Sequence, residues 1–91
     1  MKTVEVRIDG RVQGVWFRGW TVAEAIQRGL AGWVRNRHDG SVQALFHGPA
    51  GQVDDMVGAC HVGPPAARVD RVVVTPAPPP EGGSFRQLPT R

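Results

Sequence analysis

A chain of 91 residues can bury one small hydrophobic core, so we expect a single domain spanning residues 1–91. Its hydrophobic fraction of 41% and charged fraction of 21% exclude wholesale disorder. A net charge of +3 favours anionic partners but does not choose among them.

The N-terminal residues and the metal-ligating residue types narrow the class of protein further. The segment MKTVEVRIDG alternates polar and apolar residues and lacks the continuous apolar core of a signal peptide, and no apolar run approaches membrane-spanning length. One cysteine cannot form an internal disulfide, and three histidines far apart in sequence do not form a zinc-binding pattern. We therefore expect a cytoplasmic protein with no membrane partner and no metal.

The first predicted elements are a strand, a loop and a helix. Val4, Val6 and Ile8 alternate with charged residues, which is the period of a strand with one buried face. The loop GRVQGVWFR, residues 10–18, follows, and Gly29 offers a stop for the helix after it. The buried face of that helix is expected to consist of four apolar residues at helical spacing: Val22, Ala23, Ile26 and Leu30.

The middle of the chain predicts a hairpin and a second helix. Residues 32–36 and 41–48 form two strands separated by RHDG, whose Asp39-Gly40 pair favours a hairpin and therefore antiparallel pairing. From Pro49, which suits a first helical turn, apolar residues recur at helical spacing until Gly63-Pro64 ends the helix. The buried face of this second helix is expected to consist of Val53, Met56, Val57 and Cys60.

The C-terminal third predicts a fourth strand around residues 68–75 and, after the stiff proline-rich tract PAPPPEGG, a short edge strand at SFRQL. The element order is therefore βαββαβ with a possible fifth strand. The expected fold class is α+β, with an antiparallel sheet of four to five strands and both helices packed on one face of it.

The loop over residues 10–18 combines the features of an anion-binding site. A strand that ends in a glycine-bearing loop and opens into a helix presents backbone N–H groups, and the helix N-terminus adds positive potential. Gly14 permits a positive φ, Val15 and Phe17 can anchor the loop to the core, and Arg18 is placed to bind the same anion. The residues alone also allow a plain turn with a surface arginine, since the loop lacks the lysine and Ser/Thr of a nucleotide P-loop.

Two stretches of the sequence, GRVQGVWFR followed by GWVRNRHDGSV, resemble the two signature motifs of the acylphosphatase family in their order and spacing. The resemblance continues through FHGP and GPPAARV and covers nearly the whole chain up to Thr75. It implies a ferredoxin-like βαββαβ fold, in agreement with the element order above. It also implies hydrolysis of small-molecule acyl phosphates to a carboxylate and inorganic phosphate, without a metal or cofactor.

The resemblance further assigns site residues. Arg18 matches the family's phosphate-binding arginine, and Asn36 matches the asparagine that holds the attacking water, although the residues alone favour a turn asparagine there. The proline tract departs from the family pattern and leaves the pairing of the C-terminal strand open, but this departure does not alter the assigned site residues. The expected phosphate cradle consists of Gln13, Gly14, Val15, Trp16, Phe17 and Arg18.

The sequence leaves the final proton acceptor open. A side-chain amide is not usefully basic, so Asn36 can orient a water but cannot deprotonate it. The substrate phosphate can take the proton itself; His38, two residues further on, is a second candidate that we interpret as a solvated turn histidine. The ring of Trp16 either lines the entrance for the acyl group or covers the core.

The alternative interpretation is a non-catalytic anion- or nucleic-acid-binding module, because RNA-binding domains share the βαββαβ order. Such domains need aromatic residues on their two central strands, whereas the third strand here offers only Phe46 and the chain has no tyrosine. We therefore expect no nucleic-acid partner. We also expect a monomer, and the physiological acyl group stays open.

Overall fold

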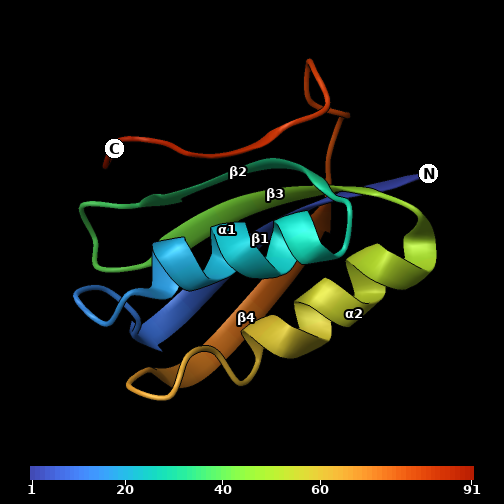
Figure 1. Ribbon diagram of the computed structural model, residues 1–91. Helices are drawn as coiled ribbons and strands as arrows, with labels where there is room; N and C mark the ends of the chain where they lie inside the picture. The colour runs from blue at the N-terminus through green and yellow to red at the C-terminus, as the bar shows by residue number, and fades with distance from the viewer.

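The order of helices and strands follows the predicted pattern. The computed structural model describes residues 1–91, and Figure 1 shows both helices on one face of the sheet. None of the helices has the length and apolar character needed to cross a bilayer. The elements are β1 (Lys2–Arg11), α1 (Phe17–Gln27), β2 (Ala31–Asn36), β3 (Val42–Gly48), α2 (Ala50–Cys60), β4 (Arg68–Pro76) and β5 (Phe85–Gln87).

The sheet has the strand order β4-β1-β3-β2-β5. The four longer strands pair antiparallel, with Ala44 of β3 opposite Val6 of β1 on one side and opposite Val34 of β2 on the other. Strand β4 pairs antiparallel with the far side of β1. The predicted antiparallel sheet with two helices on one face is therefore confirmed for four strands, and β5 is added at the edge in a parallel pairing with β2.

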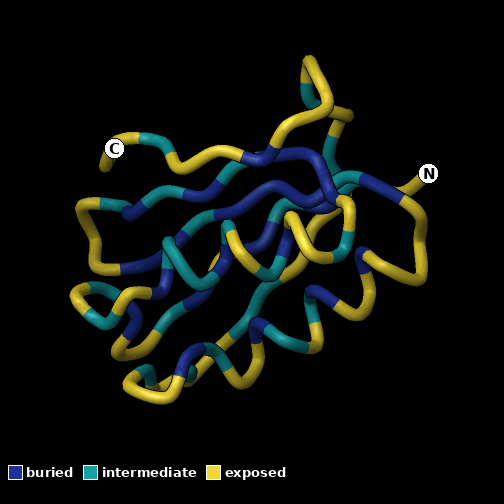
Figure 2. Tube along the Cα trace, in the orientation of Figure 1, coloured by how far each residue is buried: buried dark blue, intermediate teal, exposed yellow.

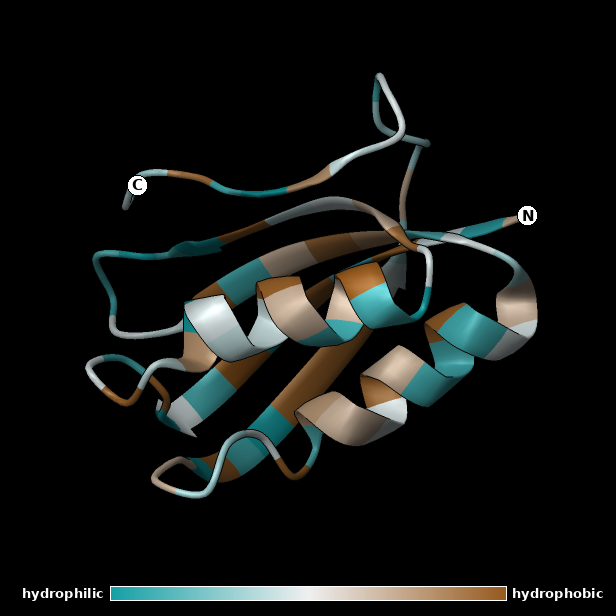
Figure 3. Ribbon diagram, viewed as in Figure 1, coloured by the Kyte–Doolittle hydropathy of each residue, from teal (hydrophilic) through white to brown (hydrophobic).

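The core lies between the sheet and the two helices. Alternation along the strands sends every second side chain toward the helices, and these side chains are the ones that lose contact with water. Figure 2 shows buried residues along the strands and exposed ones at the turns, and Figure 3 shows hydrophobic residues gathered on the central strands behind the helices. The largest fully buried side chains include Phe17, Phe46, Ile8 and Met56.

The buried face of α1 differs from the predicted one. The structure buries Phe17, Thr21 and Ala25, while Ala23 is exposed and Ile26 is 61% exposed. Thr21 can be buried because its hydroxyl donates a hydrogen bond to the carbonyl oxygen of Phe17, 2.8 Å away. The spacing of apolar residues therefore predicted the wrong face of α1. Thr21 forms its hydrogen bond within the helix and occupies a buried position where the prediction placed an apolar side chain. Among the other predicted positions, Val22 is half-buried, and Leu30 is buried just beyond the helix.

The buried face of α2 is largely the predicted one. Val53, Met56 and Cys60 are fully buried and Val57 is half-buried. The helix begins after Pro49, as predicted. Burial raises the pKa of the Cys60 thiol to about 12, so the thiol stays protonated and is not a nucleophile at neutral pH.

The C-terminal segment crosses from β4, at one edge of the sheet, to the opposite edge, where it runs along β2 (Figure 1). Two backbone hydrogen bonds flank β5: Gly32 N–H donates to the carbonyl of Ser84 at 3.1 Å, and Leu88 N–H donates to that of Val34 at 2.8 Å. The segment follows β2 to its end, where Arg91 N–H donates to the carbonyl of Asn36 at 3.0 Å. The short strand predicted at an edge is thus present, and its pairing partner is β2.

Candidate active site

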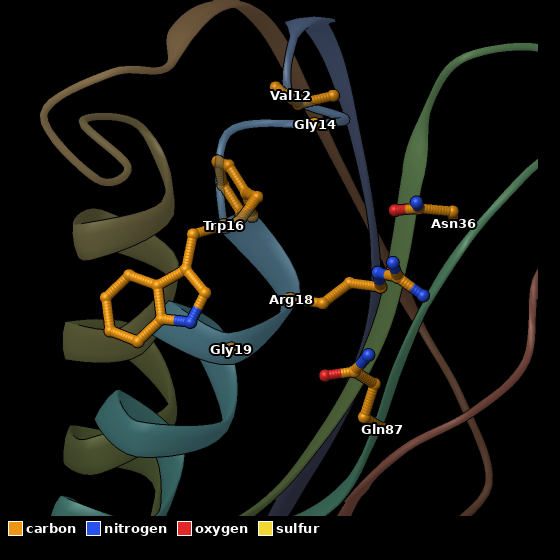
Figure 4. Close-up of a pocket in the computed structure, with 8 residues that line it drawn as sticks. Val12, Gly14, Trp16, Arg18, Gly19, Asn36 and Gln87 are labelled. Atoms are coloured by element: carbon orange, nitrogen blue, oxygen red, sulfur yellow. The ribbon is translucent and has the colours of Figure 1, made fainter.

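A pocket of about 160 Å³ lies where the loop between β1 and α1 meets the ends of β2 and β5 (Figure 4). It brings together residues that are far apart in the sequence. Of the predicted site residues, Gly14, Trp16, Phe17, Arg18 and Asn36 lie on its wall, whereas Gln13 and Val15 do not. The full set of lining residues is Val12, Gly14, Trp16, Phe17, Arg18, Gly19, Asn36 and Gln87.

Two residues of the loop have a left-handed backbone conformation. Gly14 has φ 73°, as its predicted role allows, and Trp16 has φ 64°, the only positive φ outside glycine in the chain. Such a conformation is uncommon for a bulky residue and persists where the surroundings hold it in place. The indole of Trp16 lies against Gly19, where a Cβ would come within 2.1 Å of its ring nitrogen. A larger residue at position 19 would therefore force the exposed indole of Trp16 to move, a contact that no sequence pattern indicated.

The side chain of Trp16 points away from the rest of the pocket. It is 67% exposed, and Figure 4 shows its ring on the side of α1 away from Asn36 and Gln87. Of the two predicted roles for this ring, covering the core is excluded by its exposure, and lining the acyl entrance stays a prediction.

The backbone amides of the loop have no partners within the protein. No N–H group from residues 13–19 donates a hydrogen bond to another backbone group, and α1 has no side-chain cap at its start. The first N–H groups of a helix have no intrahelical acceptor, and together with the helix dipole they form a site that favours an anion. The loop is therefore suited to bind an oxyanion.

Gln13 and Val15 hold the loop in place rather than line the pocket with their side chains. The carboxamide of Gln13 donates to the carbonyls of Arg37 at 2.7 Å and Ser41 at 2.8 Å, which ties the loop to the turn between β2 and β3. Val15 packs against the hydrophobic core, and Phe17 is 1% exposed within it. The three side chains fix both ends of the loop.

Arg18 carries a positive charge that no protein group neutralises. The guanidinium groups of Arg7, Arg28 and Arg68 pair with carboxylates, whereas Arg18 makes neither an ion pair nor a side-chain hydrogen bond. Figure 4 shows its side chain extended from the start of α1, with Asn36 on one side of the guanidinium and Gln87 on the other. This arrangement leaves the planar donors of Arg18 free for an anionic ligand.

Asn36 presents an unpartnered acceptor to the pocket. The residue is 8% exposed, and its Oδ1 is buried without a hydrogen-bond partner, the only such side-chain atom in the structure. An unpaired buried acceptor costs about 1–3 kcal/mol, and such atoms in native proteins call for an explanation. A donor supplied by a bound water or ligand would satisfy it.

The turn after Asn36 is held by a carboxylate. Asp39 accepts hydrogen bonds from the Ser41 hydroxyl at 2.6 Å and the Ser41 amide at 2.9 Å, and these two bonds hold the pKa of Asp39 below its usual range. Arg7 adds an ion pair with Asp39 at 3.0 Å. His38 is exposed on this turn and does not line the pocket.

Sequence reasoning missed three residues of the pocket wall: Val12 and Gly19, which flank the predicted loop, and Gln87 of the C-terminal strand. For Gln87 no signal was available, because a three-residue strand after a proline tract has no periodicity from which its direction could be derived. The parallel pairing with β2 brings it beside α1.

Comparison with known proteins gives a consistent result over the whole chain. The sequence model of the acylphosphatase family matches residues 4–87. An acylphosphatase from Rhodospirillum rubrum is 60% identical over 90 residues, which is 99% of each chain. The crystal structure of acylphosphatase from Bacillus subtilis superposes with a TM-score of 0.90 at 40% identity, over 97% of this chain and 99% of the other. An acylphosphatase structure from Coxiella burnetii gives a TM-score of 0.91 at 29% identity, over 96% of this chain and 92% of the other. This chain belongs to the acylphosphatase family.

Proposed function

We propose that the pocket lined by Arg18 and Asn36 performs the hydrolysis of acyl phosphates that family membership assigns to this chain. The substrates are small-molecule acyl phosphates, and inorganic phosphate is a product. The observation that carries the proposal is the unpartnered Oδ1 of Asn36 in the same pocket as the unpaired guanidinium of Arg18.

The phosphoryl group is bound by the loop and by Arg18. The free amides of residues 13–19 and the start of α1 supply donors and positive potential, and Arg18 supplies a fork that fits two phosphate oxygens. In the transition state of phosphoryl transfer, charge is spread over the three equatorial oxygens. Donors that are already in place stabilise that charge without reorganisation, so this part of the site lowers the barrier.

Asn36 positions the attacking water. Its Oδ1 accepts a hydrogen bond from the water and holds it in line with the bond that breaks. The oxygen of the water forms a bond to phosphorus while the bond between phosphorus and the bridging oxygen breaks, and the electron pair of that bond leaves with the carboxylate. Because the conjugate acid of a carboxylate has a pKa of only about 4, the leaving group departs without a general acid.

The proton of the attacking water passes to a phosphate oxygen of the substrate. The support for this route is that the pocket wall contains no carboxylate, histidine or other ordinary base. His38, the other candidate, lies outside the pocket wall on an exposed turn.

We further propose that the chain acts as a single-domain monomer over residues 1–91 in the cytoplasm. The single core between sheet and helices supports one domain. Strand β1 begins at Lys2, so the N-terminal residues belong to the same folded domain.

The test is the hydrolysis of benzoyl phosphate in the presence of EDTA by the parent protein and by Arg18→Ala and Asn36→Ala. We expect fast turnover by the parent and near-total loss in both variants, with unchanged circular dichroism spectra. Arg86→Ala, which removes an exposed arginine from β5, is the matched control and should keep parental activity. A folded parent that binds phosphate without turnover would instead identify a non-catalytic anion-binding module.

A further inference from the structure

Gln87 is a polar residue on the pocket wall that the proposed mechanism does not yet use. Its place in the fold is well determined, because it pairs with Val34 in the parallel register between β5 and β2. Backbone hydrogen bonds from Leu88 N–H to Val34 and from Gly32 N–H to Ser84 hold the strand on either side of it. Its main chain is therefore fixed relative to Asn36, two residues beyond Val34 on the same strand.

The side chain of Gln87 is directed into the site by strand alternation. Phe85 is buried in the core on the helix side of the sheet, so Arg86 faces the other side and Gln87 returns to the helix side. Figure 4 shows the carboxamide of Gln87 beside the guanidinium of Arg18, across from Asn36. The glutamine side chains that form hydrogen bonds within the protein are those of Gln13 and Gln43. The carboxamide of Gln87 forms none and is therefore free to bind a ligand.

An in-line displacement puts the attacking water and the leaving group on opposite sides of phosphorus. With the phosphoryl group at Arg18 and the water at Asn36, the acyl group extends toward the opposite side of the guanidinium, which is the side of Gln87. An acyl group presents its carbonyl oxygen there, and a carboxamide N–H is a suitable donor for that oxygen.

We propose that Gln87 donates a hydrogen bond from Nε2 to the carbonyl oxygen of the substrate's acyl group and stabilises the departing carboxylate. The inference rests on the proposed function of the pocket. As the bond between phosphorus and the bridging oxygen breaks, its electron pair moves onto the carboxylate and is shared by both carboxylate oxygens. The hydrogen bond from Gln87 strengthens as this charge develops, and no proton is transferred.

Such a donor has a signature that a packing role would lack. Its benefit grows with the charge that develops on the leaving group, so it assists a basic, poorly departing carboxylate more than a weakly basic one. Removing the donor should therefore steepen the dependence of rate on the pKa of the carboxylic acid. A residue that only shapes the rim would change all substrates by a similar factor.

The experiment measures kcat/KM for a series of benzoyl phosphates that carry electron-withdrawing or electron-donating substituents at the para position of the ring. Gln87→Met keeps the length of the side chain and removes the donor, Gln87→Ala removes both, and Arg86→Ala is the neighbouring control. We expect kcat/KM to fall about 3- to 10-fold in Gln87→Met, with the larger loss for the more basic leaving groups. The inhibition constant of inorganic phosphate, which has no acyl group, should stay at the parental value.

The outcomes separate this inference from the proposed function. An active parent whose leaving-group dependence is unchanged in Gln87→Met and Gln87→Ala overturns the inference and leaves the proposed function standing. A parent without turnover on any of the benzoyl phosphates overturns both. Weaker phosphate inhibition in Gln87→Met would also count against the inference, because it would place Gln87 at the phosphoryl group.

Discussion

Asn36 shows at the scale of one residue what distinguishes the side chain of a proposed site residue from that of a structural one. A turn asparagine normally uses its side chain to bond the backbone nearby, yet Oδ1 of Asn36 has no partner at all. The protein carries the cost of a buried unpaired acceptor at this one place, next to the unpaired charge of Arg18. The structural role that the residues alone favoured for Asn36 is therefore not what the geometry supports.

Asn36→Ala should lower kcat about 100-fold, because a water that is no longer held in line loses its orientation. The inhibition constant of inorganic phosphate should change little, since Arg18 and the loop amides remain. Because the substitution also removes the unpaired acceptor, the free energy of unfolding in urea should not fall. Steady-state kinetics with phosphate as inhibitor measure the split between the two effects.

His38→Gln, two residues further on, is the control for this prediction, and both its rate and its pH profile should match the parent. A large loss in His38→Gln would show that this histidine accepts the proton. Equal losses of kcat and of phosphate affinity in Asn36→Ala would contradict the water-positioning role.

What the sequence could predict at this scale depended on local motifs. Arg18 and Asn36 both lie in stretches that resemble a family, so they were found together although they come from different elements. Gly19 and Gln87 could not be found this way. The first lies against the indole of Trp16, a contact that depends on the loop conformation, and the second reaches the pocket only through the pairing of β5 with β2.

At the scale of elements, the loop before α1 depends on the turn after β2. The side chain of Gln13, in this loop, donates hydrogen bonds of 2.7 and 2.8 Å to the carbonyls of Arg37 and Ser41 in the turn. No other side chain donates to these carbonyls. The two elements that carry Arg18 and Asn36 are thereby joined by one side chain. Its effect on activity is indirect, through the position of the loop.

Gln13→Met should lower the free energy of unfolding by about 1–3 kcal/mol, because two hydrogen bonds to backbone carbonyls are lost while the side-chain volume is kept. Phosphate should also bind more weakly, since the loop is less well ordered. Urea denaturation and phosphate inhibition are the two measurements. Gln27→Met, at the exposed end of α1, is the matched control and should leave both values unchanged. Parental stability in Gln13→Met would refute the proposed tie.

The helices and strands themselves were predicted more reliably than the buried face of each helix and the pairing partner of each strand. Alternation in β1 and the Asp39-Gly40 pair gave the strands and the hairpin, because these signals are local. The buried face of α1 was wrong because Thr21 is satisfied within its own helix and Ile26 is left exposed. The partner of β5 depends on contacts between residues about 50 positions apart in sequence, which no local pattern contains.

At the scale of the whole molecule, the site lies at one end of the sheet, where the loop after β1 meets the turn after β2. Most ion pairs of the protein are exposed and contribute little to its stability. The carboxylate of Asp39 differs because it holds that turn through hydrogen bonds from Ser41, first from the hydroxyl and then from the amide. The pH dependence of the melting temperature should therefore report whether Asp39 is ionised and holds this turn.

The pKa of Asp39 is lower in the folded protein than its ordinary value. The folded state thus binds this proton less readily than the unfolded state, so the carboxylate stabilises the fold above its ordinary pKa, and this contribution is lost as the pH falls through the lowered value. Asp39→Asn should melt below the parent at neutral pH, and the difference in Tm should shrink in acid. Ser41→Ala, which removes the stronger of the two donors, should flatten the pH dependence of Tm. Thermal melts from neutral to acidic pH measure both. A difference between Asp39→Asn and the parent that is the same at every pH would show that the charge of Asp39 does not hold the turn.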